Sequence, residues 1–408
     1  MSSSPLNNVS KPSRDQINAF RTDMFGRTKI SEPFTLFDSA HRYQDSGDYS
    51  DTHATNGTTT YDINQSSALL NVTNASGSET TRESRRVFPY QPGKSLQVLQ
   101  TFVFAPAKTN LRQRAGYFTR QNGFYLEQDG TNVYFVKRTS ISGSVVETRV
   151  PQSEWNMDKL DGSGPSDVVL DLSKAQILFT EIEWLGVGSA RMGFAIDGYF
   201  ILAHQFNHAN RIDSVYMTTA SLPVRYEITN TGTTSGSSTM KQICTTVISN
   251  GGYFKPTEIW TAVRQSASFS QSYYPLIALR LASGRTDAVV IPDVVDISPN
   301  GAGDFEFALI RNPDSITGGT WATHAPKYNV EYNTSATAMS GGTIISQGYF
   351  ASTNQNSASA TITDSKNFAF QLGRTNANTP VSDIIVLAIR VLNGTSSAKS
   401  SLGWFDLL

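Results

Sequence analysis

The sequence has little of what secreted, disulfide-bonded or membrane proteins display. Its single cysteine, Cys244, excludes an internal disulfide framework. Cys244 follows Ile243 in an apolar stretch, which predicts a small buried core residue. No run approaches about 18 apolar residues, so no membrane-spanning helix and no membrane partner are expected. Residues 1–5 lack the apolar segment of a secretion signal, so we expect synthesis in a reducing cytoplasm.

An excess of basic charge is also missing. The chain has 33 Lys and Arg against 34 Asp and Glu, a net charge of −1. Proteins that hold nucleic acid through its phosphates carry a basic excess or a basic stripe. Here only small clusters occur, such as Arg82 with Arg85 and Arg86. Direct binding of nucleic acid is therefore not expected.

Motifs for phosphate, metal or nucleophilic chemistry are absent or incomplete. No Gly-x-x-x-x-Gly-Lys loop occurs, and the stretch Gly186-Val187-Gly188-Ser189-Ala190 does not complete the Gly-x-Ser-x-Gly pattern of a nucleophile elbow. His204 and His208 are four apart, but the sequence before them predicts a strand. On a strand they would lie about 13 Å apart, too far to share one metal ion. We expect no metal and no other cofactor.

One pair of carboxylates could support glycan chemistry. On a strand, Glu181 and Glu183 point to one face about 6–7 Å apart, within the separation that glycosidases use. The alternative is an exposed strand face that alternates with buried Ile182 and Trp184. We prefer this alternative and assign no catalytic residue. Non-catalytic contact of Trp184, Glu181 and Glu183 with a glycan remains open.

The fold class follows from dense strand signals and the lack of amphipathic helices. Asn122-Gly123, Asp129-Gly130 and Asp197-Gly198 stand between apolar runs, which is a strong signal for hairpins. Residues 84–258 therefore predict a jelly-roll or concanavalin-like β-sandwich. Residues 256–272 are expected to bridge the two β-rich parts of the chain. Residues 259–408 predict a second, smaller β-sandwich. The chain is expected to be all-β.

The first part of the chain predicts no domain of its own. Residues 1–40 have no clear period but include large apolar side chains, among them Phe20, Phe25, Phe34 and Phe37. Residues 44–83 are rich in Ser, Thr, Asn, Gly and Asp, and cannot bury enough apolar area to offset their ordering entropy. We interpret residues 1–83 as an extended arm and polar connection. The four phenylalanines could fill grooves on neighbouring subunits or on the chain's own body.

Six short sequence segments, in this order along the chain, resemble segments of a known protein family. They are Phe25-Gly26-Arg27 with Phe34-Thr35-Leu36-Phe37-Asp38-Ser39; Tyr90-Gln91-Pro92-Gly93-Lys94; Trp155-Asn156-Met157-Asp158-Lys159-Leu160-Asp161-Gly162; Trp184-Leu185-Gly186-Val187-Gly188; His204-Gln205-Phe206-Asn207-His208-Ala209-Asn210; and Pro223-Val224-Arg225-Tyr226-Glu227-Ile228. Together they resemble virion structural proteins of large marine and cyanobacterial tailed phages, over about residues 20–260. The resemblance implies a place in a particle and transfers no functional residue.

These observations predict a non-enzymatic structural component of a tailed-phage particle, located in the virion after synthesis in the host cytoplasm. Its expected partners are other copies of itself and other virion proteins, at the head, neck, tail or baseplate. The alternative is a surface adhesin or carbohydrate-binding fibre module, whose partner would be a host surface glycan.

Overall fold

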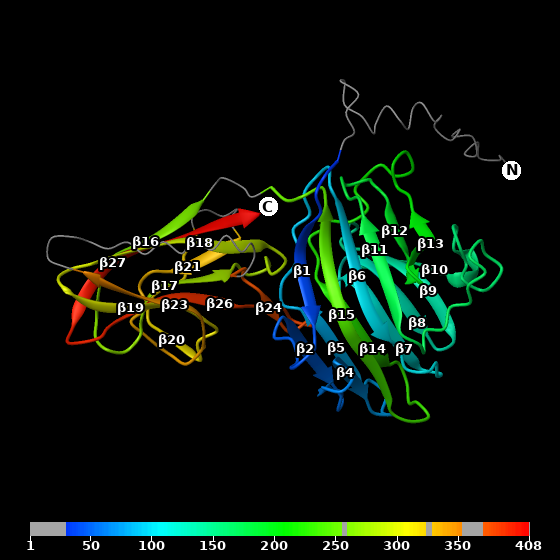
Figure 1. Cartoon of the computed structure of the whole chain (residues 1–408), viewed down its shortest axis with the longest axis horizontal. Coiled ribbons are helices and arrows are strands. Elements are labelled where there is room, and N and C mark those ends of the chain that lie inside the picture. Colours follow the sequence, from blue (N-terminus) through cyan, green and yellow to red (C-terminus); the bar gives the residue numbers. More distant parts are fainter. Residues whose placement is uncertain (1–29, 255–258, 324–328, 353–369, 408) are drawn as a thin grey trace, which may run out of the picture.

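The computed structural model describes residues 30–254, 259–323, 329–352 and 370–407. Two β-sandwiches lie side by side, the first coloured blue to green and the second yellow to red in Figure 1. The only helix among the described residues is a short 3-10 turn, η1 (Gln152–Glu154). The predicted all-β fold, a sandwich followed by a smaller one, is confirmed.

The first sandwich consists of two antiparallel sheets. The eight-stranded sheet has the order β13-β12-β11-β6-β15-β4-β3, with β1 also paired to β15. Its strands are β13 (Tyr199–Phe206), β12 (Ala190–Ile196), β11 (Gln176–Ile182), β6 (Ser95–Val103), β15 (Ser238–Asn250), β4 (Ser67–Val72), β3 (Thr58–Asp62) and β1 (Phe34–Ala40). The seven-stranded sheet has the order β10-β9-β8-β7-β14-β5-β2. Its strands are β10 (Val146–Pro151), β9 (Asn132–Thr139), β8 (Gly123–Asp129), β7 (Leu111–Phe118), β14 (Val224–Asn230), β5 (Glu79–Ser84) and β2 (Tyr49–Ala54).

The second sandwich packs a three-stranded sheet, β16-β27-β18, on a five-stranded sheet, β21-β17-β26-β19-β23. The strands are β16 (Trp260–Phe269), β27 (Ser396–Leu407), β18 (Val289–Pro299), β21 (Val330–Asn333), β17 (Tyr274–Leu281), β26 (Ile384–Val391), β19 (Gly303–Arg311) and β23 (Thr343–Ser352). Two small pairs complete it: β20 (Ser315–Thr317) with β22 (Ala338–Ser340), and β24 (Arg374–Thr375) with β25 (Val381–Ser382). The expected bridge over 256–272 is wrong from residue 260 onward, because β16 is an edge strand of this sandwich.

The expected arm and connection over residues 1–83 differs most from the structure. From Phe34 onward this part supplies β1–β5 to both sheets of the first sandwich. β1, β2 and β4 bury Leu36, Phe37, Tyr49, Leu70 and Val72 in the core, and polar β5 is held by backbone hydrogen bonds and a buried arginine. Arg82 is 1% exposed, forms an ion pair with Asp51 at 2.7 Å and with Asp45, and donates to Gln242 at 3.1 Å. Residues 1–29 lie outside the described part.

The three predicted hairpins are present, and one of them has the predicted turn. Asp197-Gly198 joins β12 to β13, and both residues have positive φ, as a type I′ turn requires. β8 and β9 are joined by Gly130 and Thr131, of which Gly130 has a φ of 60°. Asn122, expected in the third turn, is buried and connects two loops, because its side-chain amide donates hydrogen bonds to the hydroxyls of Thr218 and Ser140.

The prediction that Cys244 is buried is wrong. A β-bulge interrupts the pairing of β15 with β6 between Gln242 and Thr245, so both of these residues face the core. The bulge shifts the alternation of side chains along the strand, and Cys244 is exposed on the outer face.

Candidate functional site

The outer face of the seven-stranded sheet carries an unusual concentration of charge. On β7, Arg112 and Arg114 alternate with Gln113 and Ala115, which face the core. The register of the sheet then places acidic and basic residues opposite one another. Glu227 on β14 is opposite Arg114, and Arg114 is opposite Glu127 on β8. Sheet pairing therefore aligns side chains that come from distant parts of the chain.

These side chains form a continuous arginine–glutamate ladder, consisting of Glu83, Arg114, Glu127, Arg138, Glu147, Arg149, Arg225 and Glu227. Arg114 bonds to Glu127 at 2.6 Å and to Glu227 at 3.0 Å. Arg225 joins Glu227 at 2.9 Å to Glu83 at 3.2 Å. At the other end, Arg138 pairs with Glu147 at 2.6 Å, and Arg149 pairs with Glu127. Each carboxylate in the ladder has at least one arginine partner.

The central members of the ladder are buried although they lie on an outer face. Glu127 is fully buried, and Glu227 is 4% exposed. Burial alone would raise the pKa of Glu227, but the charges of Arg114 and Arg225 overcome it and hold that pKa far below the ordinary value. For Glu147 the same balance, with Arg138 as the main charge, gives a lowered pKa. Both carboxylates therefore stay ionised in the folded protein at neutral and mildly acidic pH.

The ladder continues into the second sandwich. Arg374, at the start of β24, donates to Glu83 at 2.8 Å and to the carbonyl of Thr286 at 3.3 Å. Nearby, Arg85 pairs with Asp383 at 2.5 Å, and the Gln371 amide donates to the carbonyl of Val87 at 2.8 Å. The segment of residues 371–383 thus connects the second sandwich to one end of the seven-stranded sheet.

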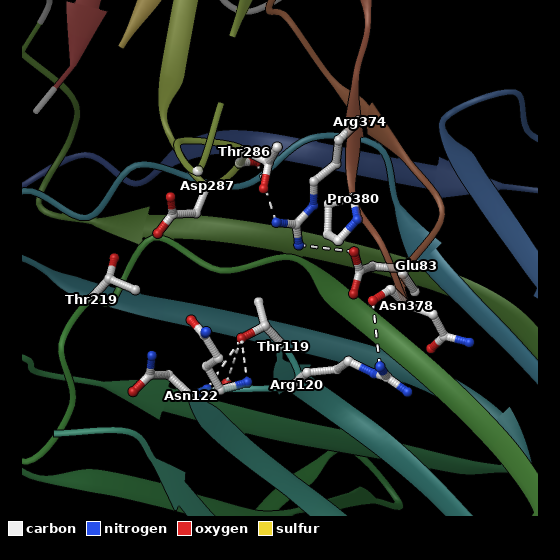
Figure 2. Close-up of a pocket in the computed structure, with 13 residues that line it drawn as sticks. Glu83, Thr119, Arg120, Asn122, Thr219, Thr286, Asp287, Arg374, Asn378 and Pro380 are labelled. Atoms are coloured by element: carbon white, nitrogen blue, oxygen red, sulfur yellow. Dashed lines mark hydrogen bonds and ion pairs between the residues drawn. The ribbon is translucent and has the colours of Figure 1, made fainter. Parts of the chain in front are cut away.

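A polar pocket of about 310 Å³ lies where the two sandwiches meet, which we call the interdomain pocket (Figure 2). The first sandwich contributes Glu83, Thr119, Arg120, Gln121, Asn122 and Thr219, and the second contributes Gly284, Thr286, Asp287, Arg374, Ala377, Asn378 and Pro380. Arg120 donates to the carbonyl of Asn378 at 3.4 Å across the pocket. The lining combines hydroxyls, amides and both signs of charge, and can therefore donate and accept hydrogen bonds.

A second hollow, of about 350 Å³, follows on the same outer face, and we call it the arginine depression. It is lined by Glu79, Arg112, Arg114, Arg120, Arg138, Val145, Glu147, Arg225 and Glu227. Arg120 lines both hollows. The two hollows are therefore neighbours along one side of the first sandwich.

The predicted glycan contacts lie on the other sheet and do not come together as one site. Glu181 accepts a hydrogen bond from Ser95 at 2.7 Å and lies 3.7 Å from Arg191. Together with Glu183 it lines a depression of only about 90 Å³. Trp184 is half-buried, packs against the core and donates its indole N–H to the carbonyl of Met217 at 3.2 Å. Trp184 is thus not a stacking surface beside the carboxylates.

The predicted assembly residues are placed differently as well. Phe37 is 2% exposed and packs against Phe88 and Tyr49, with ring centroids 5.0 and 5.9 Å apart. Phe34 stacks on Tyr253 at 5.5 Å. Both contact the chain's own body, which is one of the two surfaces expected for them, and their role in assembly is not supported by these contacts. Phe20 and Phe25 lie outside the described residues.

His204 and His208 serve the core. The ring of His208 bonds to the carbonyl of Gly188 at 2.6 Å and stacks on Tyr216 at 4.0 Å. His204 packs edge-on against Phe206 and bonds to the backbone N–H of Asn156. Burial lowers the pKa of each to about 4. Over the described ranges, no group of three or more His, Cys, Asp or Glu residues is arranged to hold a metal ion.

The ladder was not predicted from the sequence, although part of its signal is present. Arg112 with Arg114, and Arg225 with Glu227, are spaced by two, as expected for charges on one strand face. Such spacing does not reveal which strands are neighbours. The second sandwich also covers part of this face, and no local pattern predicts that contact.

No helix in the described part of the chain is long and apolar enough to cross a membrane. No protein-family model matches the chain, and no curated protein matches it. Among solved structures, a protein of unknown function from Shewanella oneidensis MR-1 aligns with a TM-score of 0.37 and 8% identity, over 62% of this chain and 100% of its own. Bacillus licheniformis β-glucanase aligns with a TM-score of 0.32 and 12% identity, over 54% and 99%.

A carbohydrate-binding module, CBM2, of the evolved Dit protein from Lactobacillus casei BL23 phage J-1 aligns as well. Its TM-score is 0.34 and its identity 7%, over 55% of this chain and 100% of the module. At these identities and scores, the alignments do not transfer a function to this chain.

Proposed function

We propose that this protein is a non-enzymatic structural component of a tailed-phage particle, which assembles with copies of itself and with other virion proteins. The observation that carries the proposal is the arginine–glutamate ladder with its extension through Arg374. It fills the outer face of one sheet with ion pairs and joins the two sandwiches into one block. A rigid, pre-joined block suits a subunit that must hold its shape among neighbours.

The chemistry of the ladder favours a structural role over glycan hydrolysis. A glycosidase needs one carboxylic acid that is protonated at working pH to act as general acid. In the ladder, arginines keep the pKa values of Glu147 and Glu227 below their ordinary values. These carboxylates are suited to hold arginines in place, and poorly suited to donate a proton.

Immunogold electron microscopy tests the proposal directly. Antibodies raised against the purified protein would be applied to particles of the virus whose genome encodes it. We expect regular labelling at one site on each particle, since a structural component has a fixed position. Particles without label, with the protein present only in the soluble fraction of the lysate, would contradict the proposal.

The first 29 residues are proposed to contribute to assembly through Phe20 and Phe25. A chain that lacks residues 1–29 keeps every described strand, unlike one that lacks residues 1–40, which loses β1. We expect the shorter deletion to fold normally and to be excluded from particles. Normal incorporation would remove this part of the proposal.

A second candidate function is carbohydrate binding on the particle surface. The interdomain pocket and the arginine depression favour it, because together they offer hydroxyls, amides, guanidinium groups and carboxylates along one face. A glycan array probed with the full chain is the first measurement. Absence of binding to any glycan would leave the structural role as the only proposal.

A further inference from the structure

The arginines of the arginine depression differ in how strongly their ion pairs hold them. Five arginines and three glutamates line it, and Glu127 and Glu83 beside it supply two further carboxylates to Arg114 and Arg225. Arg114, Arg138 and Arg225 are each within 3.0 Å of a carboxylate oxygen. Their hydrogen-bonding capacity is therefore largely used within the ladder.

Arg112 and Arg120 are engaged more weakly. The nearest carboxylate contact of Arg112 is Glu227 at 3.7 Å, longer than a hydrogen bond, and its Nε is buried without a hydrogen-bond partner. Arg120 is exposed and makes a long bond of 3.4 Å to the carbonyl of Asn378. Guanidinium groups present planar, paired donors that suit carboxylates and similar anions. These two arginines can therefore donate hydrogen bonds to an external anion.

The two neighbouring hollows indicate the size of the ligand. Arg112 lies near the start of β7 and Arg120 just beyond its end, and both line the arginine depression. Arg120 also borders the interdomain pocket. A single small anion would occupy only part of this surface, whereas an extended chain with repeated anionic groups can contact both arginines and continue into the pocket.

The glutamates between the arginines decide the class of chain. Glu79, Glu147 and Glu227 line the depression together with the arginines. These carboxylates need hydrogen-bond donors from a ligand, and the phosphodiester backbone of DNA has none. Each acidic sugar of a uronic-acid polysaccharide carries a carboxylate and also hydroxyls. Its hydroxyls can donate to the glutamates while its carboxylates bind the arginines.

We propose that the arginine depression, extended by the interdomain pocket, binds an acidic polysaccharide, with Arg112 and Arg120 contacting its uronate carboxylates. The inference rests on the second candidate function and names its ligand class. It places binding on the seven-stranded sheet, away from Glu181, Glu183 and Trp184. The structural role in a particle does not depend on it.

Isothermal titration with the full chain tests the inference. The probes are oligomers of polygalacturonate, alginate and hyaluronate, together with fully methyl-esterified polygalacturonate as the uncharged match. We expect at least one acidic oligomer to bind, with an affinity that falls as salt is added. The esterified oligomer should bind at least about tenfold more weakly, because it lacks the charge-assisted hydrogen bonds.

The double variant R112Q/R120Q should weaken binding of the acidic oligomer by at least about tenfold, because it removes the charge-assisted hydrogen bonds. The matched control is R191Q, which changes an exposed arginine on the outer face of the other sheet and should leave binding unchanged. If the double variant does not fold, R120Q alone replaces it, because Arg120 is exposed in a loop.

The other outcomes distinguish failure of the acidic-polysaccharide proposal from failure of carbohydrate binding as a whole. Equal binding of esterified and acidic oligomers, unaffected by R112Q/R120Q, overturns the acidic ligand while carbohydrate binding stands. A loss of binding in R191Q but not in R112Q/R120Q moves the site to the other sheet. Failure of all acidic oligomers, or binding of single-stranded DNA in their place, overturns the inference outright.

Discussion

Arg374 in the second sandwich donates a hydrogen bond to Glu83 in the first over 2.8 Å, and both side chains are at least 95% buried. Glu83 in turn pairs with Arg225 of the ladder. Burial makes such a pair costly to break, because removal of one partner leaves an uncompensated charge. The contact between the sandwiches is therefore part of the stability of the first sandwich as well.

The change R374A should lower the free energy of unfolding by about 3–5 kcal/mol, the range for breaking a buried ion pair. Urea denaturation followed by tryptophan fluorescence measures it. The control is R280A, because the Arg280–Glu331 pair is partly exposed and should contribute less than about 1 kcal/mol. Equal effects of the two changes would argue against the buried link between the sandwiches.

The change F37A should destabilise the first sandwich by about 3–5 kcal/mol, since Phe37 fills space between Phe88 and Tyr49. Thermal unfolding of the purified protein measures the effect. Tyr199 is 75% exposed, so Y199A is the aromatic control and should change stability by no more than about 0.5 kcal/mol. A normal melting temperature for F37A would mean that β1 is not part of the sandwich core.

The change G116A should cost about 1–3 kcal/mol through overpacking. Gly116 lies between Arg225 and Tyr125 in the register, and an added Cβ would meet the carbonyl oxygen of Phe124 at 2.4 Å. Gly236 has open space around its Cβ position, so G236A is the control. Chemical denaturation compares the two, and equal stability of both variants would speak against the close strand pairing here.

Stability should fall as the pH drops from about 6.5 to about 4. Burial lowers the pKa of His204 and His208 to about 4 in the folded protein, so the unfolded chain binds more protons in this range. Lys137 and Arg211 next to His208 act in the same direction, and its bond to the Gly188 carbonyl opposes them. The variant H208F should show a shallower decline in urea unfolding between pH 7 and 5, whereas an unchanged slope would assign the effect to other groups.

Prediction from sequence succeeded where apolar alternation and turn residues agree. The hairpins of β7–β9 and β12–β13 are examples. It failed where polar strands depend on distant partners: β5 buries Thr80, Thr81, Arg82 and Glu83, because β2 and β14 supply matching groups. In the second sandwich, the start of β27 is serine-rich and resembles a loop in sequence, although Ala398, Leu402 and Trp404 lie in the core. The ladder required the strand order, which no local pattern contains.

The order of strands in the first sandwich has a consequence for how the protein is made. β1 and β4 pair with β15, and β5 pairs with β14, so the earliest strands leave the ribosome well before their partners are synthesised. β4 can pair early with β3, and β5 with β2, but until then β1 and the other edges of β4 and β5 have only water or a chaperone as partners. We expect translation that stalls before residue 224 to release a protease-sensitive chain, and native resistance to arise only after β15 has emerged.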